Sequence, residues 1–172
     1  MNQLNVKRVK RLLSMMYEKM RAMDDEGRDL PIRWSVMHMY SSSQLAKLVA
    51  LRRGMDMELA SIAATLHDIA VIITKKKEMH AEVAEQYVRR EVSEFNTING
   101  DLFPKISKEE EDFIINAISK HSDKETYSSD QFVELLKDVD SLDRFLHGIR
   151  SEGAYLERSL RVLGELGIHL PD

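Results

Sequence analysis

The stretch that decides the fold is MELASIAATLHDIAV, residues 57–71. Its apolar residues recur every three or four positions, which is the spacing of a helix that buries one face. Asp56 comes directly before it and is a residue type that caps helices. His67 and Asp68 follow each other in the last turn of the predicted helix, beside the apolar stripe. Because both side chains can bind metal ions, this helix carries the first candidate for a functional site.

The same spacing predicts helices along the rest of the chain, and we find no alternating strand pattern and no internal repeat. Ser107 and Glu110 form a capping box at the start of one of them. The predicted helices cover residues 4–23, 34–53, 57–71, 80–95, 108–120, about 131–146 and about 152–166. The expected fold is therefore all-α, a single compact bundle-like domain of about six or seven helices over residues 1–172.

The composition excludes several classes of protein. The 172 residues are 43% hydrophobic and 31% charged, as expected for one globular domain. A net charge of -4 with mixed signs does not predict binding to duplex nucleic acid. The absence of cysteine excludes disulfides and thiolate metal sites. No secretory signal and no uninterrupted apolar run of membrane length is found, so we expect a cytoplasmic protein without membrane contact.

The first predicted helix is rich in methionine on one side and basic on the other. Its methionines suit packing against the core or against a partner subunit, so a homo-oligomer stays an open expectation. We expect the basic side to be a solvated face rather than a polyanion site. The basic residues are Lys7, Arg8, Lys10 and Arg11.

Histidines elsewhere in the chain add to the His67-Asp68 pair. His38, His80 and His121 lie at the starts or ends of predicted helices, beside apolar stripes. Imidazoles together with carboxylates suit a divalent ion such as Fe, Mn, Co, Ni, Mg or Zn. A site without thiolates leaves positions for water and substrate, so this combination favours chemistry over a structural role.

The order of these residues resembles the H…HD…D signature of the HD-domain superfamily of metal-dependent phosphohydrolases. The likeness covers roughly residues 33–145, which would be the HD core between an N-terminal and a C-terminal helix. The resemblance implies that one metal is bound by His38, His67, Asp68 and Asp140. In members with two metals, further histidines occur at places similar to His80 and His121.

Three residues are candidates for the last aspartate of the H…HD…D signature: Asp138, Asp140 and Asp143. Helical projection alone places Asp140 further from the centre of the apolar stripe than the other two. The family pattern favours Asp140, because its ligand stands three residues ahead of a second acidic position. Asp138 or Asp143 would then orient a ligand histidine or a water.

The resemblance implies an enzyme in which metal-bound water attacks a phosphate ester or anhydride, with Asp68 and His67 as the catalytic pair. It would be a phosphomonoesterase, a phosphodiesterase or a nucleotide pyrophosphohydrolase acting on a small phosphorylated substrate, which we expect to be a nucleotide. The alternative is an HD fold that binds a metal, a nucleotide or a partner without turnover.

The phosphate-binding residue is not given by the family pattern. Several members have a lysine two residues after the His-Asp pair, and this chain has Ala70 there. The remaining basic candidates near the predicted site are Arg33, Lys75, Lys76, Lys77 and Lys120.

Overall fold

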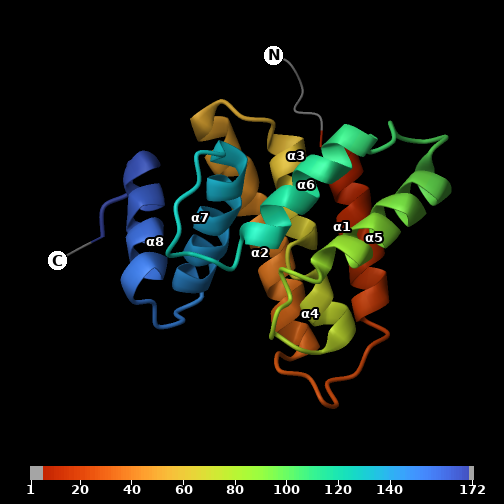
Figure 1. Cartoon of the computed structure of the whole chain (residues 1–172), viewed down its shortest axis with the longest axis horizontal. Helices are drawn as coiled ribbons and strands as arrows, with labels where there is room; N and C mark the ends of the chain where they lie inside the picture. The colour runs from red at the N-terminus through yellow and green to blue at the C-terminus, as the bar shows by residue number, and fades with distance from the viewer. Residues whose placement is uncertain (1–5, 171–172) are drawn as a thin grey trace.

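The computed structural model describes residues 6–170, and within that range the all-α prediction is confirmed (Figure 1). Seven helices have ten residues or more, and α4 is a short helix of six. The helices are α1 (Lys7–Met20), α2 (Ile32–Arg53), α3 (Met57–Leu66), α4 (Ile69–Thr74), α5 (Ala84–Asn99), α6 (Lys108–Lys120), α7 (Gln131–Leu146) and α8 (Gly153–Glu165).

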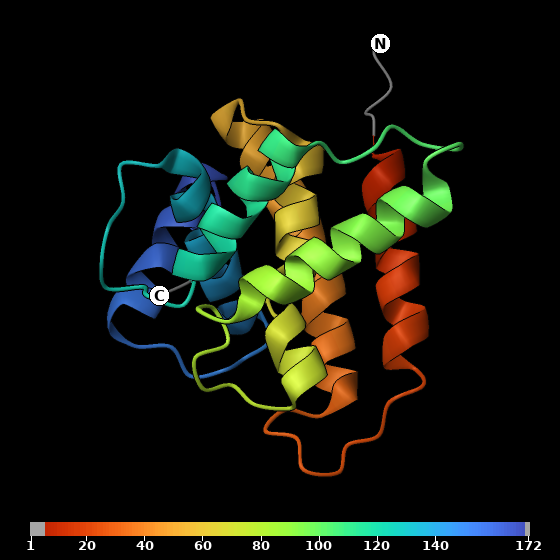
Figure 2. The ribbon, with the colours of Figure 1, turned by 45° about the vertical axis from the view of Figure 1, so that its right-hand side comes forward.

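Helix α3 lies at the centre of the molecule. It packs along α2, and α1, α6 and α7 also contact it. On the outside, α8 packs on α7 and α5 packs on α6, and α5 crosses in front of the central helices in Figure 2. Ile62, Ala63 and Leu66 are fully buried. The apolar stripe that predicted this helix therefore forms the centre of the core.

The single helix predicted over residues 57–71 is wrong at its C-terminal end, because the helix breaks at the His-Asp pair. Helix α3 ends at Leu66, and Asp68 has φ -100° and ψ 16°, outside helical geometry. Adjacent side chains on an unbroken helix point about 100° apart. At this break the two side chains lie close together, with His67 Nε2 3.7 Å from Asp68 Oδ2.

Capping residues begin two helices as predicted. Asp56 accepts a hydrogen bond from the Leu59 amide at 2.9 Å, and the capping box of Ser107 and Glu110 is present at α6. Asp130 caps α7. The predicted start of the fourth helix at residue 80 is wrong, because α5 begins at Ala84 and His80 lies in the turn before it. Of the first predicted helix, residues 4 and 5 fall outside the described range.

The expectation that the basic face of α1 is fully solvated is wrong for Arg8. Its side chain is buried and donates to Glu58 Oε2 at 2.8 Å and to both carboxylate oxygens of Glu110 at 2.8 Å. Burial of a guanidinium is tolerated because two carboxylates compensate its charge. Arg8 thus joins α1 to α3 and α6.

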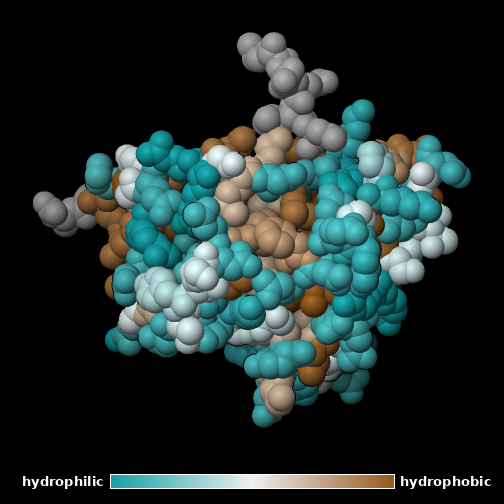
Figure 3. All heavy atoms as spheres, turned by 45° about the horizontal axis from the view of Figure 1, so that its top comes forward, coloured by the Kyte–Doolittle hydropathy of each residue, from teal (hydrophilic) through white to brown (hydrophobic). Residues whose placement is uncertain are grey.

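The central helical segment also has the length and composition of a membrane span. Met57–Thr74 has a mean hydropathy of 1.5 over 18 residues, and 72% of it is buried inside the fold. Buried core helices of globular domains have the same composition. On the face shown in Figure 3, hydrophilic side chains surround a smaller, weakly hydrophobic area.

Candidate metal centre

Three separate parts of the chain converge on one point. His38 comes from α2, His67 and Asp68 from the α3–α4 break, and Asp140 from α7. His38 Nε2 lies 3.0 Å from His67 Nε2, 3.2 Å from Asp140 Oδ1 and 3.6 Å from Asp68 Oδ2. His67 Nε2 lies 3.7 Å from Asp68 Oδ2 and 3.8 Å from Asp140 Oδ1. We call these four residues the first group.

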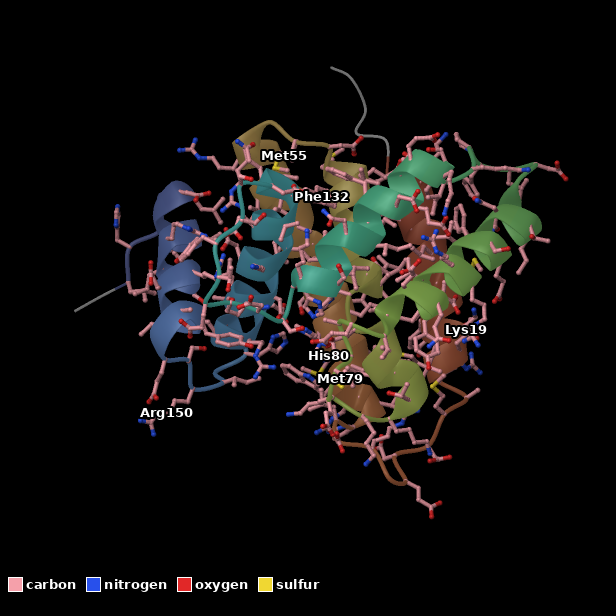
Figure 4. The ribbon with its side chains drawn as sticks, in the orientation of Figure 1. Lys19, Met55, Met79, His80, Phe132 and Arg150 are labelled. Atoms are coloured by element: carbon pink, nitrogen blue, oxygen red, sulfur yellow. The ribbon has the colours of Figure 1, made fainter. Side chains whose placement is uncertain are left out.

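A second group shares Asp68 with the first. His80 Nε2 lies 3.1 Å from His121 Nε2, and Asp68 Oδ1 lies 3.3 Å from His80 Nε2 and 3.7 Å from His121 Nε2. His80 lies in the turn before α5 (Figure 4). The two carboxylate oxygens of Asp68 therefore face different groups, Oδ2 the first and Oδ1 the second.

Each of these four histidines has its Nδ1 atom bound to an acceptor. The acceptors are Asp143 Oδ2 for His38 at 2.5 Å, the Ala64 carbonyl for His67 at 2.7 Å, the Lys77 carbonyl for His80 at 2.7 Å and the Ile118 carbonyl for His121 at 2.7 Å. Because a carbonyl or carboxylate oxygen only accepts, Nδ1 carries the proton in each case. The Nε2 atom is then the one available to a cation, and all four Nε2 atoms face the two groups.

The distances between the ligand atoms of each group fit those around a bound divalent cation. Ions bound at about 2.0–2.2 Å hold neighbouring ligand atoms about 2.9–3.6 Å apart in octahedral or tetrahedral geometry. In the first group, the Nε2 atoms of His38 and His67 lie 3.0 Å apart and 3.2–3.8 Å from the facing carboxylate oxygens of Asp68 and Asp140, and the atoms of the second group lie 3.1–3.7 Å apart. Only small movements of side chains would be needed to bind an ion in either group.

The carboxylates are ionised. Burial raises the pKa of Asp140, but the charge of Lys124 and the hydrogen bond to His38 outweigh it, so this pKa lies well below its usual range. Burial likewise raises the pKa of Asp68, and the surrounding histidines lower it further than burial raises it. Both side chains thus offer anionic oxygens at neutral pH, which hard and borderline cations prefer.

The histidines of the first group differ in protonation. Burial lowers the pKa of His67 to about 4, so its imidazole is neutral. Burial also lowers the pKa of His38, but hydrogen bonds to Asp140 and Asp143 raise it to about 10. A proton and a divalent cation compete for His38 Nε2, since both neutralise the carboxylates around it.

The three candidate aspartates have separate positions. Asp140 belongs to the first group. Asp143 contacts the other ring nitrogen of His38, Nδ1, and its Oδ2 atom also lies 3.2 Å from His147 Nδ1. Asp138 points away, because it accepts from the guanidinium groups of Arg53 at 2.7 Å, Arg158 at 2.9 Å and Arg161 at 2.5 Å. Its role is an ion-pair network that joins α2, α7 and α8.

A narrow cavity of about 190 Å³ opens onto both groups, with Asp68, Asp140, His80 and His121 in its wall. Of the basic candidates from the sequence, Lys77 lines it. The structure does not bring the others to it. Lys75 pairs with Asp24 at 3.0 Å and Lys76 with Asp29 at 3.1 Å, while Arg33 and Lys120 are exposed outside the cavity.

Three residues of this region were missed from the sequence: Lys124, Arg144 and Tyr155. Lys124 is buried and donates to Asp140 Oδ2 at 2.6 Å and to the carbonyl of His121. Arg144 and Tyr155 line the cavity. Arg144 stands one helical turn after Asp140, so its spacing was a usable signal. Lys124 lies in a connection and Tyr155 on another helix, where periodicity gives no link to the site.

A family model for the HD domain matches residues 36–145, which is more than half of the chain. The chain therefore belongs to the HD domain family, within a superfamily of metal-dependent phosphohydrolases. The matched segment contains every residue of the first and second groups. No curated protein and no solved structure matches the chain significantly.

Proposed function

We propose that the protein is a phosphohydrolase that uses two divalent cations, one in the first group and one in the second. The observation that carries this proposal is Asp68, whose two carboxylate oxygens each face a separate set of histidine nitrogens. A carboxylate in this position can bridge two cations. The reaction is hydrolysis of a phosphate ester or anhydride, and a nucleotide is the substrate that we propose.

When bound, two divalent cations would supply Lewis-acid stabilisation of phosphoryl and leaving oxygens and a nucleophile at neutral pH. The residues of the chain bind and orient. Asp68 connects the two groups, His67 presents a neutral Nε2, and Asp143 fixes the ring of His38. Lys124 holds the second oxygen of Asp140, so that Oδ1 remains directed at the first group.

Phosphate release tests this function. The protein, supplied with Mn²⁺ or Co²⁺, is incubated with mono- and dinucleotides, and released inorganic phosphate is measured. We expect turnover that a chelator abolishes and that His67→Ala reduces to background, because His67 Nε2 belongs to the first group. A protein that binds metal but shows no turnover sensitive to His67→Ala would instead be a non-catalytic HD module.

Removing the histidines of the second group should change the number of metal ions bound per chain. In the double variant His80→Ala, His121→Ala, only Asp68 Oδ1 remains of this group, while the first group keeps all four ligands. We therefore expect bound metal to fall from about two ions per chain to about one by elemental analysis. A matched control is His169→Ala, a histidine near the C-terminus whose side chain is exposed. Unchanged stoichiometry in the double variant would exclude a second ion at this place.

A further inference from the structure

We infer that the cavity beside the metal centre takes the terminal phosphoryl group of a phosphomonoester, held by Arg144 and Lys77. This inference rests on the proposed function and adds the substrate class to it. Arg144 comes from α7 and Lys77 from the connection between α4 and α5, and both line the cavity that contains Asp68 and Asp140.

Both cationic side chains lack an anionic partner within the described residues, in contrast to their neighbours. Of the three consecutive lysines, Lys75 and Lys76 pair with Asp24 and Asp29. In the described part of the chain Lys77 forms no such pair and neither does Arg144, whose guanidinium carbon lies 5.7 Å from the centre of the Tyr155 ring. Two cations without partners at the mouth of an acidic metal centre are suited to an anionic ligand.

The backbone of Lys77 is fixed on both sides. Its amide donates to Asp29 Oδ2 at 2.9 Å, and its carbonyl accepts from His80 Nδ1 at 2.7 Å. The backbone of Lys77 is thus hydrogen-bonded to His80, a residue of the second group. A phosphoryl oxygen that meets Lys77 would therefore lie near Asp68 and His80, which line the same cavity.

Arg144 has a planar group suited to phosphate. A guanidinium offers parallel N–H donors that match two phosphate oxygens, whereas an ammonium acts as a point charge. The Tyr155 ring lies beside both Arg144 and the buried Lys124, whose Nζ is 5.4 Å from the ring centre.

Cavity size favours a terminal phosphate. Pockets that enclose a whole drug-sized ligand measure about 300–1,000 Å³, and this cavity measures about 190 Å³. It is large enough for a phosphoryl group, and the rest of the substrate must remain at the opening. A monoester dianion presents three unsubstituted oxygens to the cations and the two basic side chains. A diester carries one charge and a second substituent that the cavity would have to enclose.

The reaction balances as a hydrolysis. The ester P–O bond breaks, a P–O bond forms to the oxygen of water, one proton of that water ends on the leaving alkoxide and the other stays on the phosphate. The products are an alcohol and inorganic phosphate, so inorganic phosphate is itself a ligand for the Arg144–Lys77 site.

The first test measures binding of inorganic phosphate to the full chain loaded with Mn²⁺, by titration calorimetry. We expect Arg144→Met and Lys77→Met each to weaken phosphate binding about 10- to 100-fold, the usual effect of removing a charged hydrogen-bond donor. Manganese content should stay at the wild-type value. Arg150→Met is the matched control, because Arg150 points outward after α7 (Figure 4), pairs with Glu152 and is not among the residues that line the cavity.

The second test compares p-nitrophenyl phosphate with bis(p-nitrophenyl) phosphate, which share a leaving group. We expect the monoester to be preferred, and Arg144→Met and Lys77→Met to raise its KM. Preference for the diester, absence of phosphate binding, or variants that bind phosphate as the wild type does would overturn the inference. Failure of the proposed function would give a different result, namely that neither ester is hydrolysed. In that case the phosphate titration would still show whether Arg144 and Lys77 bind phosphate.

Discussion

Asp68→Ala is expected to lose both metal ions and to reduce hydrolysis by at least about 10³-fold. The reason is that Asp68 supplies an oxygen to each group, so its removal leaves two incomplete ligand sets. Metal ions supply several kcal/mol of transition-state stabilisation, and each 1.36 kcal/mol is a factor of about ten in rate. Elemental analysis of the purified variant and phosphate release under saturating Mn²⁺ give the two values.

Asp101→Ala is the control for this substitution, because Asp101 is exposed in the connection after α5. It should keep wild-type metal content and rate. The Asp68→Ala protein should retain its helical circular dichroism, since the substitution removes a side chain from the cavity wall rather than from the apolar core. An Asp68→Ala protein with wild-type metal content would contradict the bridging role.

Asp138→Ala is expected to destabilise the fold while leaving metal binding intact. Asp138 is completely buried and accepts hydrogen bonds from Arg53, Arg158 and Arg161. Removing one partner of a buried ion pair costs about 3–5 kcal/mol, because the remaining charge is left uncompensated. For a chain of this size that corresponds to a fall in Tm of roughly 6–20 °C.

Glu152→Ala removes an exposed ion pair with Arg150 and serves as the control, with an expected cost below about 1 kcal/mol. Thermal unfolding and metal analysis are measured on the same samples. Loss of metal in Asp138→Ala at unchanged stability would mean that Asp138, and not Asp140, is the late ligand.

Much of the fold followed from the sequence, because apolar spacing and caps are local signals. The stripe of residues 57–71 marked the central helix, and the capping box at Ser107 marked the start of α6. The break at His67-Asp68 was not visible in that spacing, because apolar residues continue from Ile69 to Ile72 on both sides of the predicted face.

The candidate site was predicted less completely. The order of His38, the His-Asp pair and Asp140 resembles a family signature, and the structure places the Nε2 atoms of His38 and His67 within 3.8 Å of each other and of the carboxylates of Asp68 and Asp140. Projection on a helix favoured Asp138 and Asp143 over Asp140, because it measures only closeness to the apolar stripe. Asp138 and Asp140 are both buried in α7, and they differ in what they face across it. Lys124 could not be found because its contact with Asp140 depends on tertiary packing.

The most direct measurement of the central claim is anomalous scattering from a crystal of the protein soaked in Mn²⁺. We predict two peaks about 3.5–4 Å apart, one beside His38, His67 and Asp140 and the other beside His80 and His121, with Asp68 between them. A single peak that Asp68 does not contact, or no peak at these side chains, would contradict a two-cation centre bridged by Asp68.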